Sequence, residues 1–322
     1  ASLTKLMTAY LTFSAFKANT LSRDQVIPVS ERAWKMGGSR MFIEPRHEVT
    51  ADQLVHGMII QSGNDASVAL AEAIAGSEEA FAELMNREAK RLGMTGTHFM
   101  NSTGMPDDQH YTTARDLAIL AAAVVRDFPE DYRLYSEKEY TYNGIRQPNR
   151  NRLLWMDAAV DGIKTGHTEA AGYCLVSSAV RGPRRLISVV LGADSDGVRT
   201  QESLKLLNYG FQFFDTVRLY ENAAAVSRFR VWKGTAEEVP VGFLSDFVLS
   251  VPKGQADKLQ VKLDSVQPLE APVRKGQEVG TLTLTLDGNT IGSYPVVALE
   301  EVTLAGWFGR MWDAIRWWIK NL

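Results

Sequence analysis

The chain has 322 residues, of which 45% are hydrophobic, and it carries a formal net charge of −3. This length allows one large core and a smaller second domain, while the near-neutral charge balance gives no indication of a nucleic-acid partner. The single cysteine, Cys174, excludes an internal disulfide, and its apolar surroundings favour a buried structural thiol. No apolar run reaches the roughly 18 residues that a membrane-spanning helix needs.

Residues 1–215 are expected to form a mixed α/β domain. Apolar periodicity predicts helices in its first part at about residues 2–18, 64–76, 78–91 and 114–129. Ser77 is placed to cap the third helix and Gly93 to end it, and Thr113 with Asp116 has the spacing of a capping box for the fourth. Later in the domain the pattern predicts two strands and a last helix, at residues 173–180, 186–191 and 199–214.

Residues 216–304 show short alternating segments that are typical of strands. The clearest lie at residues 247–251, 259–263 and 282–286. The last of them has a period of two and is closed by Asp287-Gly288, which is a turn sequence. This pattern predicts a small all-β sandwich domain.

Residues 305–322 are expected to form an amphipathic helix. Four of the seven tryptophans lie here, at positions 307, 312, 317 and 318, and the segment has a net charge of +2. Tryptophan interleaved with arginine and lysine is typical of a helix in a membrane interface. The alternative is a helix docked on its own protein, although such helices usually present leucine, isoleucine and valine.

Three short motifs follow one another in the chain: Ser2-Leu3-Thr4-Lys5, Ser62-Gly63-Asn64 and Lys164-Thr165-Gly166. The first pattern alone is weak, because it recurs at Ser14 and at Ser250. Together the three motifs are similar to the signature of β-lactamases and penicillin-binding proteins, except that Gly63 stands where that signature has Asp.

The first motif has the residue types of a serine nucleophile with its base. Ser2 and Lys5 are three residues apart and share a helix face, and a desolvated lysine can lose its proton and act as general base. Ser2 lies at the helix N-terminus, which favours developing negative charge. Since chain ends fray, we expect the sequence to be a fragment whose upstream part anchors Ser2 and can hold an export signal.

The other two motifs can complete an acyl-transfer site. We expect Ser62 to relay a proton between Lys5 and the leaving amine, and Asn64 to bind a backbone carbonyl of the substrate. Lys164 adds positive charge, Thr165 offers a hydroxyl to a substrate carboxylate, and Gly166 allows close backbone approach. The alternatives without a catalytic role are a tight turn at the second motif and a basic strand edge at the third.

The strand after Gly166 can pair with an extended peptide. The backbone N–H groups of Ser2 and His167 would then form an oxyanion hole. The His167 side chain is not needed as base, because Lys5 has that role. Arg199 begins the last helix of the domain and can reach a substrate carboxylate with two hydrogen bonds.

The chain resembles the D-alanyl-D-alanine carboxypeptidases, which are class C, low-molecular-mass penicillin-binding proteins of bacteria. Beyond the motifs, the resemblance rests on QPNRNRLLW (147–155), GIKTGHT (162–168), GFQFF (210–214) and GWFGRMWD (306–313). It implies a five-stranded antiparallel sheet flanked by helix clusters, then a β-domain. It implies no cofactor or metal, and a place on the periplasmic face of the inner membrane, held by residues 305–322.

The resemblance also implies a reaction and a set of site residues. The reaction is removal of the terminal D-alanine from peptidoglycan stem pentapeptides through an acyl-enzyme on Ser2, with covalent inhibition by penicillin. The residues matched by position are Ser2, Lys5, Ser62, Asn64, Lys164, Thr165, Gly166, His167 and Arg199.

Two other functions stay open. A class A-like β-lactamase needs a Glu-x-x-x-Asn loop between the second and third motifs; Glu130, Glu137 and Glu139 lie there, and none is expected to belong to such a loop. The second alternative is a non-catalytic, membrane-associated scaffold of the cell wall. Reaction with labelled penicillin separates them, since a β-lactamase releases the adduct within seconds and a scaffold forms none.

Overall fold

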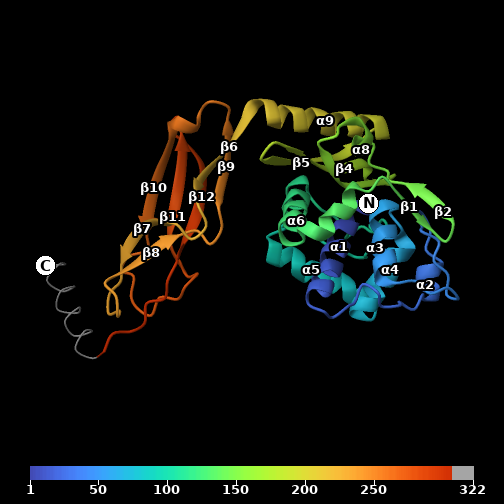
Figure 1. Cartoon of the computed structure of the whole chain (residues 1–322), viewed down its shortest axis with the longest axis horizontal. Helices are drawn as coiled ribbons and strands as arrows, with labels where there is room; N and C mark the ends of the chain where they lie inside the picture. Colours follow the sequence, from blue (N-terminus) through green and yellow to red (C-terminus); the bar gives the residue numbers. More distant parts are fainter. Residues whose placement is uncertain (307–322) are drawn as a thin grey trace. The chain divides into compact units, whose positions relative to one another are not determined.

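The computed structural model describes residues 1–306 and divides the chain into two compact units, Ala1–Phe211 and a second that begins at Gln212 (Figure 1). The amphipathic segment predicted at 305–322 lies, apart from its first two residues, outside the described residues. Within residues 1–306, no helix combines the length and apolar character needed to cross a bilayer.

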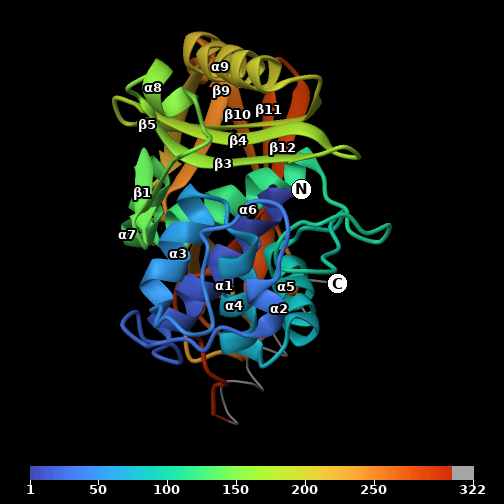
Figure 2. The same cartoon turned by 90° about the vertical axis from the view of Figure 1, so that its right-hand side faces the viewer.

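The first unit packs helices on both faces of an antiparallel sheet (Figure 2). Its sheet has the order β3-β4-β5, formed by Val160–Thr168, Gly172–Arg181 and Arg184–Ala193. Its helices are α1 (Lys5–Lys17), α2 (Glu31–Trp34), α3 (Ala51–Ile60), α4 (Asn64–Ala75), α5 (Glu78–Leu92), α6 (Ala114–Asp127), α7 (Pro129–Tyr132), α8 (Leu153–Met156) and α9 (Asp196–Phe213). A separate hairpin joins β1 (Glu139–Tyr142) to β2 (Ile145–Pro148).

The alternation of side chains along β4 decides which helices cover which face. Cys174 and Val176 belong to the large core that the helices α1 to α6 share. Leu175 and Ala179 point the other way and pack with Leu207 of α9. The sheet is therefore buried on both faces, and only its edges are left to form a site.

The described residues contribute three strands to a sheet for which the resemblance implies five. The predicted strands at 173–180 and 186–191 are confirmed as parts of β4 and β5.

The helix α1 passes through the middle of the helical cluster and is buried on nearly all sides. Leu6, Met7 and Phe13 have no exposed surface. Burial of such side chains contributes about 1.5–3 kcal/mol each. The first turn of the chain is thus held by a well-packed helix.

The predicted helix ends are confirmed in most details. Ser77 Oγ accepts the N–H of Ala80, and Gly93 has a left-handed φ of +80°. Thr113 caps α6 by accepting the N–H of Asp116. The predicted second half of that capping box is wrong, because the Asp116 carboxylate instead accepts from the loop at Gly96 and Thr97.

The second unit is the predicted small all-β domain. A five-stranded antiparallel sheet of order β10-β11-β12-β8-β7 and a two-stranded sheet β6-β9 share one apolar core. The strands are β6 (Phe214–Tyr220), β7 (Ala225–Arg230), β8 (Glu238–Gly242), β9 (Phe247–Pro252), β10 (Leu259–Ser265), β11 (Glu278–Leu286) and β12 (Asn289–Ala298).

Candidate active site

Ser2 and Lys5 lie in the first turns of the chain. Ser2–Thr4 form one 3₁₀ turn, and Lys5 opens α1 directly after it. Lys5 Nζ lies 2.9 Å from Ser2 Oγ, as their spacing of three residues predicts. Lys5 is buried, whereas Ser2 lines a cavity. A hydroxyl and an amine are therefore in direct contact at a cavity wall.

Two further contacts of the Lys5 amine suit its neutral form. Nζ donates to Asn64 Oδ1 at 2.7 Å and to the Thr103 carbonyl at 2.8 Å. A neutral amine has two hydrogens and one lone pair, so these bonds leave the lone pair for the Ser2 hydroxyl. Burial, and next the charge of Arg150, lower the pKa of Lys5 to about 7. A large fraction of Lys5 can therefore accept the Ser2 proton at neutral pH.

The second motif lies in the turn between α3 and α4. Ser62 has a φ of +61°, a conformation that residues other than glycine adopt at a cost. Asn64 Nδ2 donates to the Gly37 carbonyl at 2.7 Å, while its Oδ1 holds Lys5. The Asp65 carboxylate, one residue later, accepts the backbone N–H groups of Met41, Phe42 and Ile43. The motif thus joins the Lys5 amine to the segment that follows Gly37.

Lys164 reaches the second motif from β3, which is an edge strand of its sheet. Its Nζ donates to Ser62 Oγ at 2.9 Å and to the Thr165 carbonyl at 3.0 Å. Burial, and next the charge of Lys5, hold the pKa of Lys164 well below its usual range. Each serine therefore has its own lysine. The lysine in direct contact with the predicted relay residue Ser62 is thus Lys164, whereas Lys5 contacts Ser2.

Gly166 lies where β3 passes the first turn of the chain. A Cβ atom added at Gly166 would lie 3.1 Å from the backbone nitrogens of Ser2 and Leu3. This distance is shorter than an ordinary van der Waals contact. The missing side chain therefore lets the strand approach the nucleophile.

The three motifs border one cavity of about 680 Å³. The residues expected from the sequence that line it are Ser2, Ser62, Thr165, Gly166, His167 and Arg199. Lys5, Asn64 and Lys164 are buried directly behind this wall. Sequence reasoning missed the other lining residues, which are Gly38, Ser39, Pro148, Asn149, Arg150, Arg152, Tyr173 and Asp196. Positions 148–152 fall in a segment that carries the resemblance, and that was their only signal.

His167 and Arg199 differ in how they face the cavity. The His167 side chain is exposed, and its ring lies 4.0 Å from the ring of Tyr173. Arg199 is buried and donates to the carbonyls of Gly166 and Cys174. The structure thus brings both residues to the site, with Arg199 bound mainly to the backbone of the sheet.

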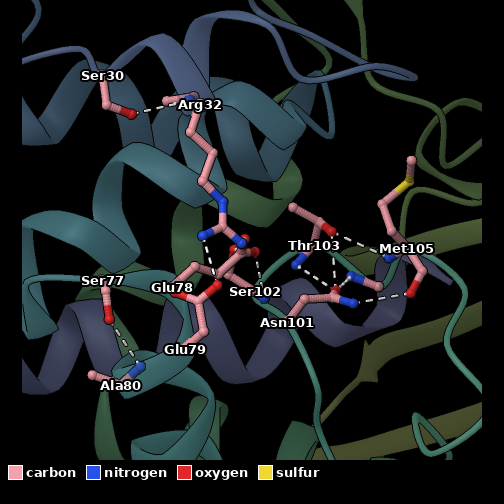
Figure 3. Close-up of polar contacts among 12 residues, drawn as sticks. Ser30, Arg32, Ser77, Glu78, Glu79, Ala80, Asn101, Ser102, Thr103 and Met105 are labelled. Carbon is pink, nitrogen blue, oxygen red and sulfur yellow. Dashed lines mark hydrogen bonds and ion pairs between the residues drawn. The ribbon is translucent and has the colours of Figure 1, made fainter.

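A buried carboxylate fixes the loop that holds Lys5 (Figure 3). Glu78 accepts the backbone N–H of Ser102 at 3.0 Å and its hydroxyl at 2.7 Å, and pairs with Arg32. Asn101 Oδ1 accepts from the backbone N–H groups of Thr103 and Gly104. The Thr103 carbonyl, which accepts from Lys5, is therefore held by contacts on both sides.

The expectation that none of the three glutamates belongs to a Glu-x-x-x-Asn sequence is wrong for Glu139, because Asn143 stands four residues after it. Both residues belong to the β1–β2 hairpin, where Glu139 pairs with Arg146. Neither residue lines the cavity that contains Ser2. Glu139 is therefore not placed to activate a water molecule for attack at Ser2.

Fold and site together define a serine–lysine acyl-transfer enzyme, in which a hydroxyl is activated by a buried amine. Residues 1–195 match the D-alanyl-D-alanine carboxypeptidase family, and residues 214–304 match the C-terminal domain of penicillin-binding protein 5. The chain belongs to the D-alanyl-D-alanine carboxypeptidase family.

Similar proteins cover nearly the whole chain. D-alanyl-D-alanine carboxypeptidase DacC of Escherichia coli is 46% identical over 98% of this chain and 81% of its own length. The crystal structure of penicillin-binding protein 5 from Haemophilus influenzae has a TM-score of 0.84 at 40% identity, and covers 94% of this chain and 90% of that one. Penicillin-binding protein D2 of Listeria monocytogenes, solved with ampicillin bound, has a TM-score of 0.61 at 33% identity, over 66% of this chain and 86% of its own.

Proposed function

We propose that this protein is a serine-type D-Ala-D-Ala carboxypeptidase that acts on peptidoglycan stem pentapeptides and is acylated by penicillin. The observation that carries the proposal is the 2.9 Å contact between Ser2 Oγ and the buried Lys5 Nζ. This contact lies at a cavity that the strand β3 borders along Thr165, Gly166 and His167. Family membership supports the same activity.

In the acylation step, neutral Lys5 takes the Ser2 proton while Oγ attacks the carbonyl carbon of the penultimate D-alanine. A carbon–oxygen bond forms, and the carbon–nitrogen bond to the terminal D-alanine then breaks. The proton that Lys5 received then passes to the leaving amine by way of Ser62, whose hydroxyl Lys164 contacts, and Lys5 is neutral again. The products are an ester on Ser2 and free D-alanine.

In the deacylation step, a water molecule attacks the ester carbon and gives its proton to Lys5. The bond between the acyl carbon and Ser2 Oγ breaks, and Oγ regains a proton from the lysine. The shortened peptide leaves as a carboxylic acid. The substrate is expected to lie along β3, with its carbonyl oxygen facing the backbone N–H groups of Ser2 and His167.

Penicillin tests this mechanism directly. Attack by Ser2 on the β-lactam carbonyl opens a ring, so the leaving nitrogen stays attached and the adduct keeps the full mass of the drug. Mass spectrometry of the digested protein should place this mass on the peptide that contains Ser2. Ser2→Ala should form no adduct and keep the circular dichroism spectrum of the parent. An adduct on another peptide, or none on the parent protein, would refute the assignment.

The same experiment separates the two alternatives. A β-lactamase would release the adduct within seconds, whereas a carboxypeptidase of this kind retains it long enough to be isolated. A scaffold with an inactive site would never gain the mass. Release of D-alanine from a peptide that ends in D-Ala-D-Ala then establishes the reaction itself.

We further propose that the protein works at the periplasmic face of the inner membrane, as a peripheral protein anchored by residues 305–322. The support lies in the sequence of this segment, with its four tryptophans and net charge of +2. Tryptophan rings suit the interface, and the positive charges are attracted to anionic lipid headgroups.

A further inference from the structure

Met105 is an exposed methionine next to the catalytic residues. The chain has ten methionines, and five of the nine within residues 1–306 are at most 2% exposed. Met105 and Met156 are the most exposed of these nine, at 39% and 48%. Met105 also lines a second cavity, of about 420 Å³. A small solute can therefore reach its side chain.

The sulfur of Met105 contacts the amide that holds the general base. Met105 Sδ lies 3.8 Å from Asn64 Nδ2. That amide nitrogen has two hydrogens, and it donates one of them to the Gly37 carbonyl at 2.7 Å. The thioether, which is a weak acceptor, faces the other. On the opposite side of the same amide, Oδ1 accepts from Lys5. Met105 and Lys5 are therefore joined through one planar group.

The backbone of Met105 is held by its neighbours in the same loop (Figure 3). Its N–H donates to Thr103 Oγ1 at 3.1 Å, and its carbonyl accepts from Asn101 Nδ2 at 3.0 Å. The Thr103 carbonyl is the other acceptor of the Lys5 amine. The loop that supplies an acceptor to Lys5 therefore also keeps Met105 beside Asn64.

We propose that Met105 is an oxidation site, at which hydrogen peroxide converts the thioether to a sulfoxide and thereby slows the acylation of Ser2. The effect on acylation rests on the proposed function, whereas the site itself does not. The sulfur lone pair attacks one oxygen of the peroxide, the oxygen–oxygen bond breaks and a sulfur–oxygen bond forms. The leaving hydroxide takes the proton of the transferred oxygen and departs as water. The sulfur is oxidised by two electrons, which reduce the peroxide.

Oxidation changes the acceptor that the Asn64 amide faces. A sulfoxide oxygen accepts hydrogen bonds far better than a thioether sulfur, and it makes the side chain polar. Bonded to this sulfur, the oxygen competes with the Gly37 carbonyl for the amide hydrogens and draws Nδ2 toward Met105. Because the amide is planar, Oδ1 moves with Nδ2 and its contact with Lys5 is disturbed. Small misplacements of reacting groups are costly, so acylation should slow about tenfold.

Treatment of the full chain with hydrogen peroxide tests the site and its effect separately. Tandem mass spectrometry should find one added oxygen on Met105 before any on the buried methionines. Fragmentation is needed because the tryptic peptide 92–115 also contains Met94 and Met100. After the peroxide is removed, the second-order rate constant for penicillin acylation should be about tenfold lower, with an unchanged circular dichroism spectrum. Methionine sulfoxide reductase should restore the rate.

Two leucine variants provide the comparison. Met105→Leu has no sulfur at this position, so the ratio of its acylation rates after and before treatment should be close to one, whatever its rate before treatment. It keeps Cys174 and therefore also shows whether oxidation of the cysteine contributes. Met156→Leu is the matched control, because it removes the other exposed methionine, which does not line the cavity that contains Ser2. This variant should lose the same fraction of its rate as the parent.

Each contrary result overturns a different step. If Met105 stays unmodified while Met156 is fully oxidised, Met105 is not an oxidation site. If Met105 gains its oxygen and the acylation rate does not fall, the coupling through Asn64 is wrong. If Met105→Leu is slowed as strongly as the parent, another residue is responsible. Failure of the proposed function would appear earlier, because the untreated parent would not be acylated by penicillin; the effect on acylation would then fail with it, while mass spectrometry would still decide the site.

Discussion

At the scale of single residues, the site gives different contacts to two buried lysines, Lys5 and Lys164, whose positive charges affect each other. Lys5 has two acceptors for its hydrogens and a hydroxyl for its lone pair. Lys164 binds the other serine and feels the charge of Lys5. Two like charges buried near each other disfavour double protonation. The arrangement therefore favours a state in which one amine is neutral, and Lys5 has the geometry to be that amine.

The pH dependence of acylation follows from the lowered pKa of Lys5. Only neutral Lys5 can take the Ser2 proton, so the rate should rise with pH through about 7 and level off above it. Well below this midpoint the rate should fall about tenfold per pH unit. The measurement is the second-order rate constant for penicillin acylation between pH 5 and 9. A flat profile over this range would exclude Lys5 as the base.

A substitution at Lys5 provides the control for this profile. Lys5→Arg keeps a positive charge but cannot be deprotonated in a protein, so acylation should be lost at every pH in the range. Acylation by Lys5→Arg with the profile of the parent protein would place the base elsewhere.

At the scale of elements, activity depends on how closely β3 passes the start of α1. Gly166 leaves no side chain between the strand and the backbone nitrogens of Ser2 and Leu3. The register of the sheet places Lys164 opposite Val176 and Gly166 opposite Cys174. Because β4 is packed on both faces, β3, which pairs with it, cannot slide to relieve a clash. The space available to a side chain at position 166 is thus fixed by the packing of the whole sheet.

Gly166→Ala should separate β3 from the nucleophile. The added Cβ would lie 3.1 Å from two backbone nitrogens, so the first turn or the strand must move by a few tenths of an ångström. We expect acylation to slow by about 10- to 100-fold, since small misplacements of reacting groups are costly. Overpacking should lower the free energy of unfolding by about 1–3 kcal/mol. Stopped-flow acylation and urea denaturation measure the two effects.

Gly197→Ala is the matched control for this variant. A Cβ at Gly197 would have Ser195 Oγ as its nearest neighbour, at 3.8 Å, which is an ordinary contact. The parent acylation rate is expected. Equal rates for Gly166→Ala and the parent would show that the close approach has no role in catalysis.

At the scale of the whole molecule, sequence reasoning predicted what local patterns encode. Periodicity located α1, α4, α5 and α6 and the strands β4, β5, β9, β10 and β11. The first motif correctly placed Lys5 beside Ser2. Ser77 and Thr113 were recognised as caps because a cap is a local hydrogen bond.

What sequence reasoning missed depends on contacts between distant segments. No local pattern shows that Lys164 binds Ser62, because that contact spans 102 residues and is set by sheet position. The commitment of Arg199 to the carbonyls of Gly166 and Cys174 follows from β3 and β4 lying side by side. The Asp116 carboxylate does not complete the expected capping box, because it accepts the backbone N–H of Gly96 instead. The spacing of residues in the sequence indicates which of them belong to the site, and tertiary packing determines what each side chain contacts.

The membrane anchor is the remaining prediction at the scale of the whole molecule. It assigns catalysis and membrane binding to different segments of the chain. The motif residues and Arg199 all lie within residues 2–199, so deleting residues 305–322 should leave penicillin acylation unchanged. The same deletion should abolish sedimentation with vesicles of anionic lipid, because the tryptophans and the positive charges are lost together. Comparable sedimentation of the full and shortened chains would show that the anchor lies elsewhere.

Replacing the four tryptophans by serine in the full chain distinguishes the two contributions to binding. The net charge of +2 is kept in this variant, so any binding that remains is electrostatic and should disappear as ionic strength rises. We expect the variant to bind weakly at low salt and to be released at about 0.15 M salt, where the parent still binds through its buried rings. Binding by the serine variant that resists salt would contradict an interfacial helix and favour recognition of a lipid headgroup by charge and shape.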